Sequence, residues 1–242
     1  MRTSAISAIK YSSYLEARAN EIKQTRSGEK TKLKLLASTA RLLATKAQQE
    51  VSVVDIARGA GMAKGTFYIY FETKEDMLLE LLESYIAFEW QTFPILEAIE
   101  ENYRATYTFV EWYEGAFASN SGLLRCLVQL NDTDERFQTL WLNRNNKIVD
   151  RLLSDNKRRL GVTSDVDSEL LRKVIHALGA AMDQTLFTRY GVHRLVESHK
   201  TPNPMESIEL HAVLNYRAMY LKNPPKGAMI FTKPLLEMQA SS

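Results

Sequence analysis

Proline is absent from residues 1–93 and from residues 95–201; one proline stands at position 94 and the other five lie from position 202 onward. Proline lacks a backbone donor and interrupts helices, so two long stretches without it favour helical structure. Across these stretches apolar residues recur at spacings of three and four, which is the period of an amphipathic helix. The sequence therefore predicts an all-α protein.

The helices are separated by short polar segments. We expect helices over about residues 31–47, 53–60, 63–71, 74–90, 95–119, 122–131, 134–160, 167–191 and 205–221. The intervening SNSG (119–122), NDTD (131–134), GVTSD (161–165) and SHKTPNP (198–204) have the composition of turns or linkers. Residues 1–29 form either a leading helix to about Gln24 or a flexible extension, and residues 222–242 read as a tail.

Charge and cysteine content limit the classes of partner. Residues 1–76 carry 13 Lys and Arg against 8 Asp and Glu, whereas residues 77–221 carry 15 against 20. The basic first third suits a polyanion, although a solvated surface gives the same count. One cysteine, Cys126, allows no internal disulfide, and no apolar stretch is long enough for a membrane span. These features predict a cytoplasmic protein without a membrane partner.

The segment VVDIARGAGMAKGTFYIYFETK (53–74) places small residues before a cluster of aromatics. Two helices that cross through a tight turn need a small residue at the crossing, here Ala57, and a glycine where the chain reverses, here Gly61. Apolar residues expected to hold the two helices together are Ile56, Ala60, Met62, Phe67 and Tyr70. The segment therefore predicts a helix-turn-helix, although two short buried helices would share the pattern.

The second helix of this motif presents groups suited to B-DNA. Lys64 and Lys74 are expected to neutralise phosphates, and Gly65 permits close approach of the backbone. The candidate DNA-binding residues are Ser52, Lys64, Gly65, Thr66, Tyr68, Tyr70 and Lys74. Threonine and tyrosine hydroxyls donate to phosphates or contact base edges, and a serine at a helix N-terminus binds phosphate together with backbone N–H groups.

This segment closely resembles the DNA-binding signature of the TetR family of bacterial transcriptional regulators. The matching residues are Ser52, Val53, Asp55, Ile56, Ala57, Ala60, Gly61, Lys64, Gly65, Thr66, Tyr68, Tyr70, Phe71, Lys74 and Glu75. Where the family usually has serine before Lys-Gly-Thr, this chain has Ala63, which removes one capping hydroxyl. The resemblance implies a helix-turn-helix domain at 30–76, after the extension at 1–29, and a helical domain at 77–221 that dimerises and binds a small effector, followed by the tail at 222–242.

Aromatic residues of the second domain are candidates for an effector pocket, and plain core is the alternative. Phe109, Tyr113 and Phe117 recur at i, i+4 and i+8. The candidate ligand-binding residues are Tyr107, Phe109, Trp112, Tyr113, Phe137, Trp141, Asp183 and Phe187. A largely aromatic cavity with one carboxylate suits an apolar or weakly cationic effector.

Two later helices carry apolar faces and small residues. The candidate dimer-interface residues are Leu171, Val174, Leu178, Met182, Ile208, His211 and Asn215. A homodimer would present two recognition helices about one DNA turn apart, or a multiple of it, to a palindromic operator. The alternative is that these faces complete the core of one subunit.

No pattern of catalytic or metal-ligating residues is present in the sequence. The four histidines, at 176, 193, 199 and 211, include no i, i+4 pair, and no phosphate-binding loop or nucleophile motif is found. We therefore expect no enzyme, metal or cofactor. The best hypothesis is a TetR-like regulator, a repressor released from operator DNA by a small, largely apolar effector; the alternative is a helical ligand-binding protein or enzyme whose first helices do not bind DNA.

Overall fold

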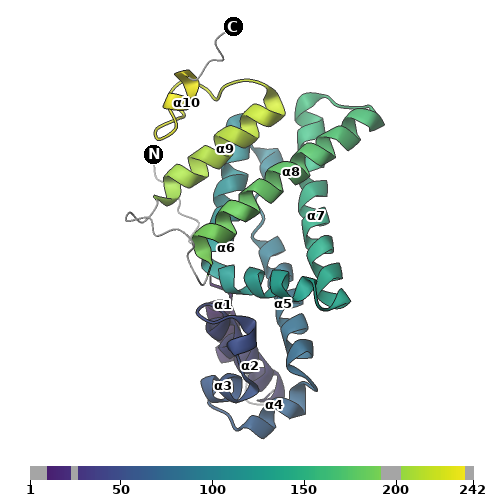
Figure 1. The fold of residues 1–242 in the computed structure, drawn as a ribbon, viewed down its shortest axis with the longest axis vertical. Coiled ribbons are helices and arrows are strands. Elements are labelled where there is room, and N and C mark those ends of the chain that lie inside the picture. Colours follow the sequence, from purple (N-terminus) through teal and green to yellow (C-terminus); the bar gives the residue numbers. More distant parts are fainter. Residues whose placement is uncertain (1–9, 23–26, 192–202, 238–242) are drawn as a thin grey trace. The chain divides into compact units, whose positions relative to one another are not determined.

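The computed structural model describes residues 10–22, 27–191 and 203–237, and these residues form helices and connecting segments without any strand. The helices are α1 (Tyr11–Glu21), α2 (Ser27–Leu43), α3 (Val53–Gly59), α4 (Lys64–Tyr70), α5 (Lys74–Gln91), α6 (Asn102–Asn131), α7 (Glu135–Leu160), α8 (Asp165–Tyr190), α9 (Pro204–Tyr220) and α10 (Pro234–Glu237) (Figure 1). Short 3-10 turns lie at Gln48–Glu50 and Leu96–Ala98. The predicted all-α class is confirmed.

The chain forms two compact units, each made of separate segments. As far as they are described, the first comprises Met1–Phe93, Gly115–Arg144 and Tyr190–Arg194, and the second comprises Pro94–Glu114, Asn145–Arg189 and Leu195–Ser242. Helices α6 and α7 each contribute one part to each unit. The basic residues at 2, 23 and 26, the histidines at 193 and 199, and most of the predicted linker at 198–204 lie outside the described residues.

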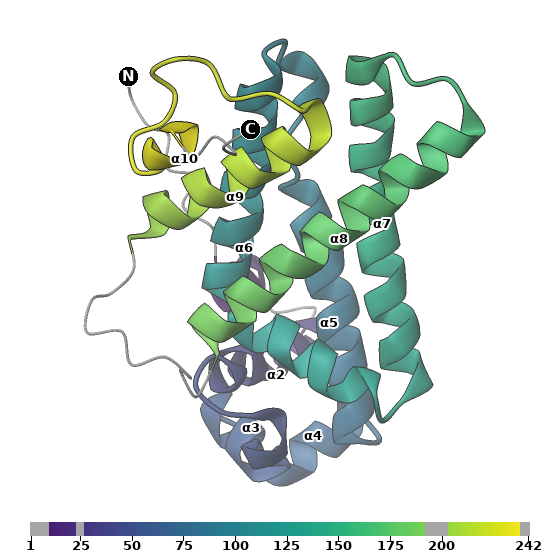
Figure 2. The same cartoon turned by 45° about the horizontal axis from the view of Figure 1, so that its top comes forward.

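The core of the first unit is formed by apolar residues on one face of each helix. Leu35, Ile56, Phe67, Met77 and Leu81 are fully buried. Sequence-coded caps set the helix starts, because Ser52 accepts a hydrogen bond from the N–H of Asp55 and Thr73 accepts one from Asp76. In this unit α3 and α4 lie side by side (Figure 2).

A buried ion pair also belongs to the first unit. The Arg144 guanidinium of α7 donates two hydrogen bonds, of 2.7 and 2.6 Å, to the Glu89 carboxylate of α5. Both side chains are almost fully buried. Cys126 of α6 is buried in the same unit, and burial raises the pKa of its thiol to about 12.

In the second unit, residues that follow α9 are bonded to that helix. Glu209 of α9 accepts hydrogen bonds from the N–H groups of Ile230, Phe231 and Thr232 and from the Thr232 hydroxyl, at 2.6–2.9 Å. We call residues 222–237 the C-terminal segment; it lies beside α9 in both views (Figures 1 and 2). Burial alone raises the pKa of Glu209, but these four donors outweigh burial and hold the pKa below the usual glutamate value.

One predicted helix boundary is confirmed and another is wrong. The predicted break at 119–122 contains Asn120, whose backbone (φ −131°, ψ 23°) is not helical, and α6 has a kink there. Residues 95–101, in contrast, are not the start of α6, which begins at Asn102. The Glu101 carboxylate caps α6 by accepting from the N–H groups of Tyr103 and Arg104, and Arg159 donates to the carbonyls of Leu96 and Ile99.

Other turns are as predicted. Asp132–Asp134 separates α6 from α7, and Gly161, at φ +67°, follows the last residue of α7. A positive φ is unfavourable for residues with a side chain, so glycine suits this position. Within the described part of the chain no helix is both long enough and apolar enough to cross a lipid bilayer.

Candidate nucleic-acid interface

The turn between α3 and α4 has the geometry that its glycine predicts. Gly61 adopts φ +74°, its N–H donates to the carbonyl of Arg58, and the N–H of Met62 donates to Ala57. This is a Schellman ending, in which a left-handed residue closes a helix and satisfies its last carbonyls. Helix α4 then begins at Lys64, three residues after the glycine.

Burial separates the two faces of the motif. Ile56, Ala57 and Phe67 are buried, whereas Lys64 and Gly65 are exposed. Of the other predicted bracing residues, Ala60, Met62 and Tyr70 are only partly covered. Phe67 thus fixes α4 against the first unit and leaves the remaining face of the helix available.

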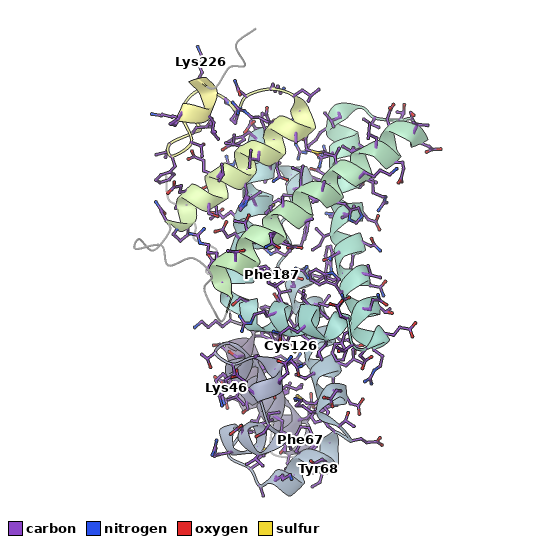
Figure 3. All side chains as sticks on the ribbon, viewed as in Figure 1. Lys46, Phe67, Tyr68, Cys126, Phe187 and Lys226 are labelled. Carbon is purple, nitrogen blue, oxygen red and sulfur yellow. The ribbon has the colours of Figure 1, made fainter. Side chains whose placement is uncertain are left out.

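The exposed face of α4 carries large side chains. Tyr68 is 52% exposed and Ile69 is 75% exposed. Figure 3 marks the Tyr68 side chain on α4. The Tyr68 ring stands edge-on to Phe67, and the Lys64 ammonium lies 5.9 Å from the centre of the Tyr68 ring. Thr66 is partly covered. Exposed aromatic and aliphatic groups beside a cation suit a surface that contacts another molecule.

Ser52 and Lys74 have partners within the protein. The Ser52 hydroxyl donates to the Asp55 carboxylate at 2.8 Å while accepting from the Asp55 N–H, and this side-chain hydrogen bond holds the pKa of Asp55 below its usual value. The Lys74 ammonium donates to the carbonyls of Gln48 and Val51 at 3.1 and 3.4 Å. Lys74 therefore ties the start of α5 to the segment that precedes α3.

The contact between α2 and α3 contains residues that the sequence did not single out. The Ser38 hydroxyl donates to the Ile56 carbonyl at 2.9 Å, and a Cβ on Gly59 would lie 2.3 Å from that hydroxyl oxygen. Arg41 of α2 donates to the Gly59 carbonyl at 2.9 Å. Gly59 was visible as a small residue, but its partners, eighteen and more residues away, gave no local signal.

The candidate ligand-binding residues divide between the two units. Phe137, which is fully buried, and Trp141, which lies beside Arg144, belong to the first unit. Tyr107, Phe109, Trp112, Tyr113, Asp183 and Phe187 belong to the second. The assignment of these eight residues to one pocket stays a prediction.

Within the second unit, some of the candidate ligand-binding residues contact one another. Phe109 stacks on Tyr113 with ring centres 5.8 Å apart, and Trp112 lies 6.1 Å from Phe109. The Tyr113 hydroxyl donates to the Asp183 carboxylate at 2.5 Å. Helices α6 and α8 are thus joined by an aromatic cluster with one carboxylate. Tyr107 and Phe187 lie on the same two helices and are half-buried.

A buried polar network in the second unit was missed by sequence reasoning. The Glu114 carboxylate accepts from Arg189 of α8 at 3.0 Å and from Ser207 of α9 at 2.9 Å. His211 Nδ1 lies 3.8 Å from the same carboxylate. The network joins α6, α8 and α9, and its members are too far apart in sequence to be paired without the structure.

The candidate dimer residues are partly used inside the subunit. Met182, Ile208 and His211 are buried in the single chain, which leaves them little surface for a partner, and Asn215 donates to the His211 carbonyl. Leu171, Val174 and Leu178 are half-buried. More exposed apolar residues lie on the same two helices: Val166, Leu170, Met205, Leu210 and Leu214.

Comparison with known proteins identifies relatives of the helix-turn-helix motif. Residues 35–81, which span α3, the Gly61 turn and α4, match the family model described as bacterial regulatory proteins, tetR family. Residues 35–81 are thus a TetR-family N-terminal domain. Among curated relatives, the chain is 33% identical over 119 residues to the HTH-type transcriptional regulator EthR of Mycolicibacterium smegmatis; the match covers 48% of this chain and 54% of that protein. The chain thus spans about half the length of the curated relatives it matches.

Two more comparisons agree. The EthR regulator of Mycobacterium tuberculosis is 31% identical over 121 residues, or 48% of this chain and 55% of that protein. A putative TetR-family regulator from Syntrophomonas wolfei has a similar solved structure, with a TM-score of 0.58 at 18% identity over 79% of this chain and 96% of that one. At that identity the solved structure supports the fold, and the curated relatives are transcriptional regulators by name.

Proposed function

We propose that this chain is a TetR-like DNA-binding transcriptional regulator, a repressor that a small, largely apolar effector releases from its operator. The observation that carries the proposal is the face of α4, where Lys64, Gly65, Tyr68 and Ile69 are exposed on a helix fixed by buried Phe67. A short recognition helix of this kind enters the major groove of B-DNA. A cytoplasmic location fits this role.

Each exposed group has a distinct task in the proposed complex. The Lys64 ammonium neutralises a phosphate, while Tyr68 and Thr66 contact base edges or thymine methyl groups. Gly65 allows the backbone of α4 to approach the groove. Since the Ser52 hydroxyl is engaged with Asp55, the backbone N–H groups at the start of α3 are the better phosphate donors there.

Lys74 and Tyr70 contribute differently. Because the Lys74 ammonium already donates to two carbonyls, its main task is to position the segment before α3, and its charge adds to the positive potential around the motif. Tyr70 is half-buried and its hydroxyl lies next to Gly28 of α2, so we assign it mainly to bracing α4 against α2.

The proposed partner is a second copy of this chain. Leu170 on α8 is 62% exposed and Leu214 on α9 is 46% exposed. Ala177, Ala180 and Ala181 of α8 are exposed as well. Large apolar residues and small ones on neighbouring helices suit close helix packing across a two-fold axis. We propose these exposed residues as the centre of the interface, in place of the buried Met182, Ile208 and His211.

The proposed effector site is the aromatic cluster of the second unit. Phe109, Trp112 and Tyr113 offer apolar surface, and Asp183 offers one carboxylate that Tyr113 already holds. An effector shifts the protein only if it binds two conformations unequally. For a repressor, it must prefer the conformation in which the two α4 helices no longer fit the operator.

The test is a titration of the DNA duplex that lies upstream of the chain's own gene with the full-length protein. Binding is measured by fluorescence anisotropy at salt concentrations from about 50 to 200 mM. Lys64→Ala is compared with Lys226→Ala, which removes an exposed lysine of the C-terminal segment far along the chain from the motif. One lost phosphate contact lowers the salt slope by about 0.9. We expect this for Lys64→Ala and no change for Lys226→Ala.

Two results would contradict the proposal. If the wild-type chain bound no duplex more tightly than unrelated DNA of equal length, a specific regulator would be excluded. If Lys64→Ala and Lys226→Ala behaved alike, DNA binding would not use the exposed face of α4, and the alternative of a helical ligand-binding protein would gain.

A further inference from the structure

Helix α1 precedes the part of the chain that matches the family model, which begins at residue 35. It is nevertheless packed into the first unit. Tyr11, Leu15 and Ala19 recur every four residues and are buried at 2, 2 and 1% exposure. One full stripe of α1 is therefore core, which leaves the position of α1 little freedom.

The N-terminal end of α1 is held by α5 and α6. The Tyr11 ring lies 5.5 Å from the Tyr85 ring and 5.1 Å from the Phe88 ring of α5. The backbone N–H of Tyr11 donates to the Asn120 side-chain oxygen at 2.8 Å. This N–H belongs to the first turn of α1, where no carbonyl of the helix can reach it, and Lys10 supplies no side-chain cap.

Asn120 is also the residue at which α6 bends. Its backbone leaves the helical region, its side-chain nitrogen donates to the Ala116 carbonyl at 3.2 Å, and its oxygen receives the Tyr11 N–H. The Asn120 side chain thus bonds to a carbonyl of α6 at the bend and also caps the start of α1. A change in the bend moves that oxygen and breaks the cap.

The middle of α1 is linked to the helix-turn-helix. Glu16 forms an ion pair with Arg41 of α2, and the same guanidinium donates to the carbonyl of Gly59, the last residue of α3. Gly59 lies two residues before Gly61, where the chain turns towards α4. Contacts therefore run without interruption from Asn120 through α1 and Arg41 to the turn of the motif.

We infer that α1 is a positioning element of the DNA-binding motif: it links the bend of α6 at Asn120 to the end of α3 at Gly59 and thereby sets DNA affinity without contacting DNA. The part of the inference that concerns DNA affinity rests on the proposed function. It assigns Glu16, Arg41 and Asn120 as positioning residues, and it explains why an additional helix before the matched domain is packed rather than extended.

The test compares Glu16→Gln with Glu21→Gln in the full chain. Both changes remove one negative charge from α1, and Glu21 is exposed at its last turn. Loss of a carboxylate by itself raises affinity for a polyanion. We expect Glu16→Gln instead to weaken binding to the upstream duplex about two- to five-fold, the range an exposed ion pair supports, with an unchanged salt slope and a melting temperature lower by at most about 4 °C. Glu21→Gln should bind as the wild type or slightly tighter.

A second readout needs no DNA. Hydrogen–deuterium exchange over residues 53–60 should be faster in Glu16→Gln than in Glu21→Gln, and Asn120→Ala should accelerate both 11–21 and 53–60. Equal exchange over 53–60 in the two glutamine variants, or an Asn120→Ala effect confined to 11–21, would overturn the inference. If neither the wild type nor any variant bound DNA, but exchange over 53–60 was faster in Glu16→Gln and Asn120→Ala, the proposed function would fail and the linkage through α1 would stand.

Discussion

Gly122 of α6 offers the sharpest test of how the first unit is assembled. A Cβ at this position would lie 2.2 Å from the carbonyl oxygen of Leu43 and 2.8 Å from the backbone nitrogen of Ala44. Ordinary carbon–oxygen contacts are about 3.3 Å, so Gly122→Ala must push the end of α2 and α6 apart by about 1 Å. Arg125, one turn further along α6, donates to the same Leu43 carbonyl at 2.8 Å, so that bond is strained as well.

The size of the effect follows from two opposing terms. Overpacking against backbone costs about 1–3 kcal/mol and often more, whereas alanine in a helix interior gains up to about 1 kcal/mol over glycine. Since the neighbour is backbone and cannot rotate away, we expect a net loss of about 1–3 kcal/mol. For a chain of this size that corresponds to a melting temperature lower by about 2–12 °C.

Gly65 of α4 is the matched control for stability, measured without DNA. Apart from the helix's own backbone, no described atom lies within 4 Å of a Cβ built there, so Gly65→Ala should raise the melting temperature by up to about 4 °C through helix propensity alone. Differential scanning calorimetry of both variants gives the answer directly. A Gly122→Ala variant that melts as high as Gly65→Ala would refute the close contact between α6 and the end of α2.

Two further predictions concern single charged groups. The folded protein holds the pKa of Glu209 below its usual value, so the stabilisation by its carboxylate is complete above the unfolded value of about 4.3 and is lost as the pH falls through the lower folded value. The protection of the amides of residues 229–232, measured as their exchange rate relative to that of an unstructured peptide at the same pH, should therefore fall on acidification in the wild type and already be low at neutral pH in Glu209→Gln. Lys74→Ala removes two ammonium–carbonyl hydrogen bonds and should lower the melting temperature by about 2–4 °C. It should reduce the salt dependence of DNA binding less than Lys64→Ala does. An equal reduction with an unchanged melting temperature would identify Lys74 as a phosphate contact instead.

The helix-turn-helix was predictable because its determinants are local. A cap at Ser52, a left-handed glycine at Gly61 and alternation between buried Phe67 and exposed Tyr68 all lie within seventeen residues. Each of these signals acts through the backbone within one or two turns, so the sequence alone determines the local geometry. The same holds for Thr73 at the start of α5.

What escaped prediction depends on residues far apart in the chain. The sequence predicted the break at 119–122, but not that the Asn120 side chain there bonds to Ala116 and to Tyr11, 109 residues earlier. Glu209 gave no sign that it would gather the backbone of residues 230–232. Composition and period identify helices and their apolar faces, but not which distant donor meets which acceptor.

The chain's one cysteine has a practical consequence. Cys126 is 1% exposed, and with its thiol pKa near 12 only about one molecule in ten thousand carries a thiolate at pH 8. Maleimide probes should therefore ignore the native thiol and modify only a cysteine added on the surface, such as Glu72→Cys beside α4. In a symmetric dimer, one such label per chain gives a single label-to-label distance, which reports the separation of the two α4 helices. The proposed effector response can therefore be followed as a change in this distance, without first replacing the native cysteine.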